Sequence, residues 1–301
     1  MPVHRPRWVG YLLILLAAGL WSTSGFYAKS PIFDDWPLES RGIVLAFWRA
    51  AFAALALAFF VRRPQFRWPL LPMMGFFTVM NWLYLSAMVQ VEASIAIWLQ
   101  STAPVWVFLF SVVALRERVV PRDWWMLLWS FAGTLLILLP QVGRAPAEGL
   151  IFGLASGFMY AGVVVSLRYL RNCDSAWLVF LNHLAAALVF LPFAWRTGIQ
   201  PTWGQLAFLF CFGAGQMALP YLLFARGLRT IAGHEASLIG LLEPILLPLW
   251  VFLAWRSHPQ YLAPDWTTLV GGGMILVGLV QRYAIHLRGP RPPAVADEPG
   301  S

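Results

Sequence analysis

The carboxylate of Glu243 is the group whose place in the sequence most clearly suggests chemistry. It lies in the stretch LLEPILLPLW, residues 241–250, within a longer apolar run. An ionisable group inside a membrane helix is costly and by default indicates a functional site. Glu243 could bind a substrate ammonium group or carry a coupling proton. Alternatively, it could cap backbone loosened by Pro244, or pair with Arg49 or His183.

Arg49 and His183 occupy corresponding places in the second and seventh apolar segments of the chain. Arg49 could receive a substrate carboxylate, and a histidine at this depth could titrate near neutral pH. The alternative for both residues is structural. In that case the side chains snorkel or form hydrogen bonds between helices.

Aromatic and small polar residues at similar depths predict a binding cavity. Asn81, Tyr84 and Met88 are spaced i, i+3 and i+7, which places them on one helix face. A single Trp or Tyr is more often interfacial or part of the packing, so this prediction depends on convergence of the whole set. Such a pocket suits aromatic and other apolar amino acids. The predicted substrate-binding residues are Trp21, Asn81, Tyr84, Trp98, Ser101, Tyr160, His183, Gln216, Tyr221 and Glu243.

Three prolines within apolar segments predict bends. Pro104, Pro244 and Pro248 each lack a backbone N–H, and the carbonyls they free are tolerated only against protein or a wet cavity. A packing kink would explain them, but Pro104 and Pro244 occupy matching positions in two halves of the chain. We therefore predict hinges at these prolines, or bends that widen a cavity.

Composition places the chain in a membrane. Of 301 residues, 60% are hydrophobic and 11% are charged, with 17 Trp and 22 Phe. Soluble domains are nearer half apolar and a quarter charged. The net charge of +8 comes from basic residues scattered through short loops, which argues against nucleic-acid binding. Cys173 and Cys211 match no disulfide or metal spacing, so we expect neither a metal nor a cofactor.

A bilayer core of about 30 Å requires roughly 20 apolar residues per helix. That length predicts an all-α polytopic protein with ten transmembrane helices. The N-terminal sequence MPVHRPRWVG lacks a cleavage site, which predicts a retained first helix. Residues 287–301 are Pro-rich and predicted to be disordered. The predicted spans are 8–29, 42–61, 70–90, 94–115, 122–140, 149–170, 175–195, 203–226, 234–255 and 265–286.

The basic residues orient these spans. Most of the 21 Lys and Arg residues fall in loops on the side of the N-terminus. The positive-inside rule therefore predicts that both termini are cytoplasmic. The expected location is the cell inner membrane, with a multi-pass topology.

An internal repeat divides the chain. Residues 92–124 resemble residues 232–266 at an offset of 140, so that Pro104 matches Pro244. The repeat predicts two units, 8–140 and 149–286, of five helices each. Because five is odd, the second unit must cross the membrane in the opposite sense. Inverted repeats are typical of secondary transporters, whose site lies at the midplane between the halves around a central cavity.

Particular residues carry a resemblance to a known family. The Leu20-Trp21-Ser22 sequence, the helix of Arg49, the A-S-x-A run that ends in Pro104, the Arg-Glu-Arg after it and Glu243-Pro244 resemble the drug/metabolite transporter superfamily. The match is to its EamA-type ten-helix branch, which includes exporters of aromatic and other amino acids. The resemblance implies export. The sequence departs from an exact repeat where Ala103 stands opposite Glu243, and Ser257-His258 opposite Glu117-Arg118.

Other classes fit less well. There is no HExxH, GxSxG or CxxC motif for an enzyme, no Walker motif for a nucleotide-driven pump, and the spans are too apolar for a channel. We expect a secondary transporter that exports or exchanges small metabolites by alternating access, most of all aromatic or other apolar amino acids. Another metabolite or drug is the alternative, and a membrane enzyme without a recognisable motif is a more distant one. The expected partners are a small-molecule substrate and membrane lipid, without nucleic acid, in a monomer or homodimer.

Overall fold

A computed structural model describes residues 7–115, 121–170, 172–227, 230–231, 236 and 239–284. Every regular element in these ranges is a helix, which confirms the all-α prediction. Eight helical segments are long and apolar enough to cross a bilayer, and Leu242–Trp255 and Trp266–Gln281 are shorter apolar helices. The predicted tail 287–301, the basic loop 116–120 and much of the start of the ninth span lie outside the described residues.

The first half contains five spans, two of which are interrupted. Only the first span, near Ser22, and the fourth, near Thr102, consist of two helices each. A short η1 turn (Pro31–Phe33) follows the first span. The helices are α1 (Arg7–Trp21), α2 (Ser24–Ala28), α3 (Leu38–Ala58), α4 (Leu70–Gln90), α5 (Ala93–Gln100), α6 (Ala103–Leu115) and α7 (Pro121–Leu138).

The second half follows after a short η2 turn (Leu139–Gln141). Its eighth span is continuous but changes to a π-helix in the middle, the segment η3 (Cys211–Ala218). The helices are α8 (Ala147–Tyr169), α9 (Ser175–Arg196), α10 (Trp203–Phe210), α11 (Leu219–Gly227), α13 (Leu242–Trp255) and α14 (Trp266–Ala284).

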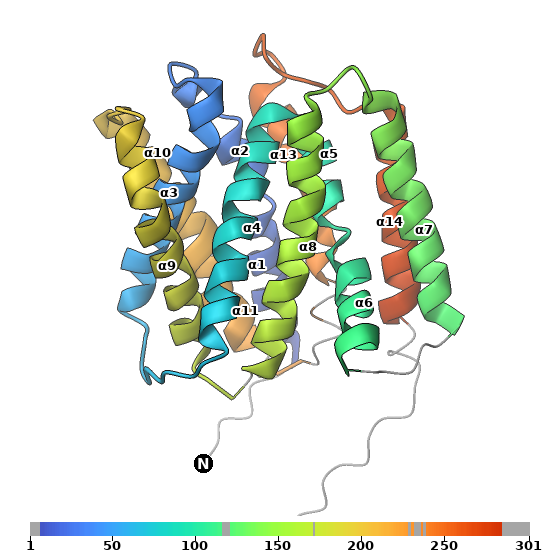
Figure 1. The fold of residues 1–301 in the computed structure, drawn as a ribbon, viewed down its shortest axis with the longest axis horizontal. Coiled ribbons are helices and arrows are strands. Elements are labelled where there is room, and N and C mark those ends of the chain that lie inside the picture. The colour runs from blue at the N-terminus through green and yellow to red at the C-terminus, as the bar shows by residue number, and fades with distance from the viewer. Residues whose placement is uncertain are drawn as a thin grey trace, which may run out of the picture.

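The two halves have opposite orientations. In Figure 1, α1 begins and α14 ends at the lower face, whereas the connection between α7 and α8 crosses the upper face. We call these faces the terminal side and the linker side. Helices from different halves pack against each other, with α3 on α9, α4 on α8, α1 on α11 and α7 on α14. The predicted inverted arrangement of two five-span repeats is confirmed.

The outer surface of the bundle is apolar. Large hydrophobic side chains on the outer helices are exposed, among them Leu128, Phe131 and Leu188. Trp203 and Trp266 begin α10 and α14 and are 88% and 69% exposed. Because Trp prefers the headgroup region, these positions fit the ends of membrane spans. Polar caps also fix helix ends, and at the start of α10 Thr202 and Gln205 form a capping box.

Glycines allow α7 and α14 to approach closely. A Cβ atom on Gly271 would lie 2.6 Å from the carbonyl oxygen of Gly133 and 2.7 Å from Cγ1 of Ile137. A Cβ atom on the neighbouring Gly273 would meet nothing within 4 Å. Small residues at helix contacts of this kind are typical of membrane bundles.

This difference predicts opposite results for two alanine substitutions. G271A forces α7 and α14 apart, and we expect it to lower the free energy of unfolding by ~1–3 kcal/mol. G273A adds a methyl group in open space and favours the helix, so its melting temperature should match or exceed that of the wild type. Thermal unfolding in detergent measures both. Equal melting temperatures would contradict the close packing.

Candidate functional site

Interrupted helices meet near the middle of the bundle. α1 and α2 are separated at Ser22 and Thr23, α5 and α6 at Ser101 and Thr102, and α13 begins after a turn at Leu241. The π-helical segment η3 adds a fourth irregularity. Backbone groups freed in this way need protein or water partners, and π segments are frequent at functional sites. The interruptions therefore mark the place to look for a binding site.

The predicted hinge prolines lie at these interruptions or near them. Pro104 is the second residue of α6, and Pro244 is the third residue of α13. The N–H groups of a first helical turn have no partner within the helix, so a proline there loses no hydrogen bond, and both prolines suit the start of a helix. Pro248 lies inside α13, which continues to Trp255. Their action as hinges stays a prediction.

Side chains from both halves form hydrogen bonds at the interruption of the first span. The indole Nε1 of Trp250 donates to Ser22 Oγ at 2.8 Å, and Gln216 Nε2 donates to the carbonyl of Trp21 at 2.9 Å. Ser24 Oγ and the hydroxyl of Tyr84 are 2.8 Å apart. The break between α1 and α2 is thus held by hydrogen bonds from α4, η3 and α13.

A cavity extends from these interruptions toward the terminal side. Its larger chamber has a volume of about 380 Å³, and an adjoining chamber has about 60 Å³. Leu167, Phe224 and Leu279 line the larger chamber near the terminal ends of α8, α11 and α14. The two chambers share the lining residues Trp21, Gln100, Tyr160, Tyr221 and Glu243.

Aromatic rings form one wall of the larger chamber. The ring centroid of Trp21 lies 5.0 Å from that of Tyr221 and 5.2 Å from that of Phe224. The apolar remainder comes from residues such as Val107 and Val164. This lining can take up an apolar or aromatic group through dispersion and ring contacts.

The smaller chamber contains the guanidinium group of Arg49. Arg49 is 3% exposed and donates a hydrogen bond from Nη2 to Oδ1 of Asn81, whose Nδ2 donates to the Ala46 carbonyl at 3.2 Å. Its Cζ lies 5.1 Å from the ring centroid of Phe212 and 6.0 Å from that of Tyr84. Because its Nε–H is buried without a partner, this cation can donate a further hydrogen bond to a ligand in the chamber.

Glu243 comes from the other half and lines both chambers. It lies in the first turn of α13, where the helix dipole favours a negative charge. Within the part of the chain that the structure describes, no hydrogen bond or ion pair engages its carboxylate, and it pairs with neither Arg49 nor His183. Beside it, Gln216 Oε1 is buried without a partner. A guanidinium and a carboxylate thus line one cavity without a direct ion pair between them.

The structure brings most of the predicted residues together. Asn81 stands behind Arg49 as its acceptor. The other residues placed at the cavity are Trp21, Tyr84, Ser101, Tyr160, Gln216, Tyr221 and Glu243.

Two predicted residues lie elsewhere. The indole of Trp98 packs on α14, where a Cβ atom on Gly272 would be 2.7 Å from its Cδ2. His183 is 1% exposed, lies against Phe77 and is within 2.8 Å of the Val179 carbonyl through Nδ1. Both side chains belong to the packing around the site.

Sequence reasoning missed several residues at the cavity. Ser24, Gln100 and the methionines Met80 and Met217 line the smaller chamber. Gln100 offered a signal, because it is a polar residue in an apolar segment, directly before Ser101. The methionines gave none, since an apolar side chain in a membrane helix can face lipid, protein or a cavity.

Comparisons with known proteins agree with this architecture. The family model described as the EamA-like transporter family matches residues 8–139 and again residues 147–281. An uncharacterized transporter of Archaeoglobus fulgidus is 28% identical over 90% of this chain and 95% of its own length. The uncharacterized inner membrane transporter YicL of Salmonella typhimurium is 25% identical over 91% of this chain and 96% of its own.

Two further proteins are similar. The pseudopaline exporter CntI of Pseudomonas aeruginosa is 26% identical over 65% of this chain and 68% of its own length. One crystal structure has a TM-score of 0.64 over 94% of this chain and 97% of that chain, at 18% identity. This last likeness concerns the fold alone.

The hydrogen bond between Arg49 and Asn81 predicts a non-additive pair of substitutions. N81L leaves a buried guanidinium without its acceptor and should lower the free energy of unfolding by ~1.5–3 kcal/mol. In R49M/N81L both polar groups are gone, so we expect a loss smaller than the sum of the single losses. Unfolding in mixed detergent micelles measures each variant.

Asn182 provides the matched control for this pair. It is 2% exposed, and its Oδ1 is buried without a partner, so N182L removes no hydrogen bond to a charged group. Its effect should be smaller than that of N81L. Strictly additive losses for Arg49 and Asn81 would show that the two residues do not act as a pair.

Proposed function

The chain belongs to the EamA-like transporter family, and from this premise we propose that it exports or exchanges small amino-acid-like metabolites by alternating access. The proposed substrates are aromatic and other apolar amino acids. One observation carries this proposal: a guanidinium from the first half and a carboxylate from the second face a common cavity with an aromatic wall, and they are not paired with each other.

The charges in the cavity are complementary to a zwitterion. An amino acid carries a carboxylate, which Arg49 can receive, and an ammonium group, which Glu243 can receive. Such charge-assisted hydrogen bonds are about twice as strong as neutral ones, and they are stronger in a cavity with little water. The apolar side chain would then occupy the larger chamber, whose 380 Å³ is within the range of small-molecule sites.

Substrate binding would engage both halves at once. We propose that the units 8–140 and 149–286 move relative to each other around this site, with Pro104, Pro244 and Pro248 as hinge points. A ligand held by Arg49 on one unit and by Glu243 on the other favours the state in which the two groups approach. A ligand shifts an equilibrium between states only through this kind of differential contact.

The basic residues and the similar proteins support one orientation of the chain in the membrane. We propose the cell inner membrane as the location, with both termini in the cytoplasm, so that the cavity of this conformation extends toward the cytoplasm. The inner membrane relative YicL supports the location. The similarity to a pseudopaline exporter supports outward transport. Because pseudopaline is not one of the proposed substrates, transport should be tested with a wide panel of metabolites.

Transport by the purified protein is the first test. Proteoliposomes loaded with unlabelled phenylalanine should take up labelled phenylalanine without ATP, because exchange needs no net driving force. R49Q and E243Q should lower the initial rate at least tenfold, while E39Q, which alters an exposed acid at the start of α3, should not. If folded protein exchanges none of a broad panel of amino acids, the proposed substrate class is wrong.

Competition by substrate analogues tests the two charge contacts separately. 3-Phenylpropionate lacks the ammonium group, and phenethylamine lacks the carboxylate. Each should compete with labelled phenylalanine about tenfold or more weakly than phenylalanine itself, because it leaves one buried charge unpaired. In E243Q, this difference should shrink for 3-phenylpropionate and persist for phenethylamine. The reverse pattern would contradict the assigned roles of Arg49 and Glu243.

A further inference from the structure

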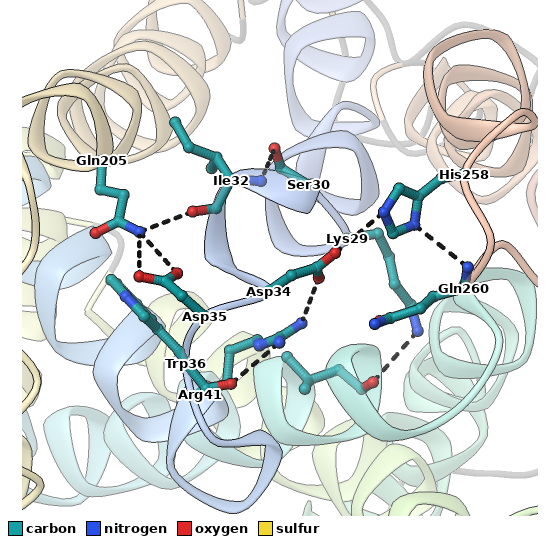
Figure 2. A network of polar contacts seen from close by, with 11 residues as sticks. Lys29, Ser30, Ile32, Asp34, Asp35, Trp36, Arg41, Gln205, His258 and Gln260 are labelled. Atoms are coloured by element: carbon teal, nitrogen blue, oxygen red, sulfur yellow. Dashed lines mark hydrogen bonds and ion pairs between the residues drawn. The ribbon is translucent and has the colours of Figure 1, made fainter.

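A polar network connects the two halves on the linker side (Figure 2). Asp34 lies between η1 and α3, and its Oδ1 is 3.3 Å from Nη1 of Arg41. Its Oδ2 is 3.0 Å from Nε2 of His258, which follows α13. Asp34 therefore joins a cation of its own half to a histidine of the other half.

Two further side chains, Gln205 and Trp255, make hydrogen bonds between the halves on this side. Gln205 of α10 donates from Nε2 to Asp35 Oδ1 at 2.9 Å and to the Ile32 carbonyl at 2.8 Å. The indole Nε1 of Trp255 donates to the Phe26 carbonyl at 2.9 Å. The larger chamber of the central cavity extends to the terminal side, whereas on the linker side these contacts hold the halves together.

We propose that Asp34 and His258 form a latch that holds the linker side closed, and that protonation of His258 tightens this latch. The proposal rests on the alternating-access function proposed above, in which the linker side must open for release. The conformational measurement described below requires no substrate, so it can fail or succeed independently of the substrate assignment.

The hydrogen bonds of His258 define its state in this conformation. Its Nδ1 accepts a hydrogen bond from the backbone N–H of Gln260 at 3.3 Å. An accepting Nδ1 carries no proton, so in the neutral ring the hydrogen is on Nε2, the atom that lies 3.0 Å from Asp34 Oδ2. Protonation of Nδ1 would end the long contact with Gln260 and give the 3.0 Å contact between Nε2 and Asp34 the character of a charge-assisted bond. The gain exceeds the loss, because the charge-assisted bond is the shorter and stronger of the two.

The position of the pair allows protons to reach it. The side chain of His258 is 24% exposed and that of Asp34 is 29% exposed. Histidine is the side chain that proteins most often use to take up a proton near neutral pH. Proton uptake from the linker side would thus shift the protein toward the state that is closed on that side.

Other titratable and charged groups surround the latch, and the effect of their protonation must be distinguished from that of His258. Most of them line the same space of about 190 Å³ as Asp34 and His258, and one lies two residues before His258 in the sequence. Burial lowers the pKa of Lys29 to about 8, and burial raises the pKa of Glu92. The remaining groups that face His258 are Arg41, Tyr261 and, on its own loop, Arg256.

The corresponding position of the other half lacks such a switch. At the offset of 140, Asp34 corresponds to Asp174, which caps α9 on the terminal side. Asp174 Oδ2 accepts hydrogen bonds from the backbone N–H groups of Arg62 and Arg63 at 3.0 and 3.2 Å. Its recorded contacts among the described residues involve no titratable side chain. Among the described residues, protonation of a histidine would therefore act on the contact of Asp34 and not on those of Asp174.

Distance measurements between spin labels test the latch. In the full chain with Cys173 and Cys211 replaced by Ser, labels at positions 38 and 262 span the linker side, and labels at 66 and 169 span the terminal side. All four native residues are exposed, and the protein is studied in lipid nanodiscs at pH 5.5 and 7.0. Both values lie below the pKa of about 8 to which burial lowers Lys29, so that Lys29 is charged in most molecules at either pH.

We expect the short 38–262 distance to dominate at pH 5.5. At pH 7.0 the ratio of closed to open molecules should fall by about three- to tenfold, as expected when a charge-assisted hydrogen bond becomes a neutral one. The 66–169 distance should change in the opposite sense. D34N should lower the closed fraction at both pH values, and H258Q, which keeps a donor but cannot titrate, should make it independent of pH.

Two controls guard against other causes. E39Q removes an exposed acid on the same side and should keep the wild-type response to pH. E92Q should also keep it, although burial raises the pKa of Glu92. The latch is overturned if the wild type does not respond to pH, if H258Q responds as the wild type does, if D34N leaves the closed fraction unchanged, or if E92Q alone abolishes the response.

Discussion

The requirement that every buried backbone group in a membrane find a partner governs this structure. A continuous helix meets it internally, but the first, fourth and ninth spans are interrupted near the middle of the bundle. The carbonyl of Trp21 is taken up by Gln216, and the interruption at Ser22 is held by Trp250, both from the other half. Because the broken helices depend on these contacts, polar side chains must gather at the centre, which is also where a substrate can find them.

The duplicated architecture supplies symmetry, while individual residues break it. Both halves restart a helix near a proline, at Pro104 and at Pro244, yet only the second places a carboxylate there. Opposite it, Arg49 of the first half faces the smaller chamber. A site built from two inverted units thus has opposite charges at its two ends, with a cation from the first half and an anion from the second. This asymmetry fits a zwitterion better than a ligand with a single charge.

The sequence was sufficient for the architecture because membrane helices depend on length and composition. The spans follow from those properties, the repeat follows from the matching residues of the two halves, and most of the cavity residues were found as polar or aromatic side chains at similar depths. Trp98 and His183 show the limit: they lie at the right depth, but depth does not fix the rotation of a helix about its axis, and both turn into the packing. The linker-side network escaped notice for a different reason. Lys29 and Arg41 are loop charges in the sequence, and only folding brings Arg41 and His258 to the same carboxylate, that of Asp34.

The glycine contact between α7 and α14 constrains how the halves can move. These helices belong to different halves, and their backbones touch at Gly133 and Gly271. Packed interfaces of this kind are bistable or fixed and do not stretch continuously. The halves are also joined where α3 packs on α9, α4 on α8 and α1 on α11, so they cannot simply move apart. A change of access must therefore proceed by rotation or sliding within these helix pairs, and the α7–α14 pair, whose backbones are in contact, leaves little room for it.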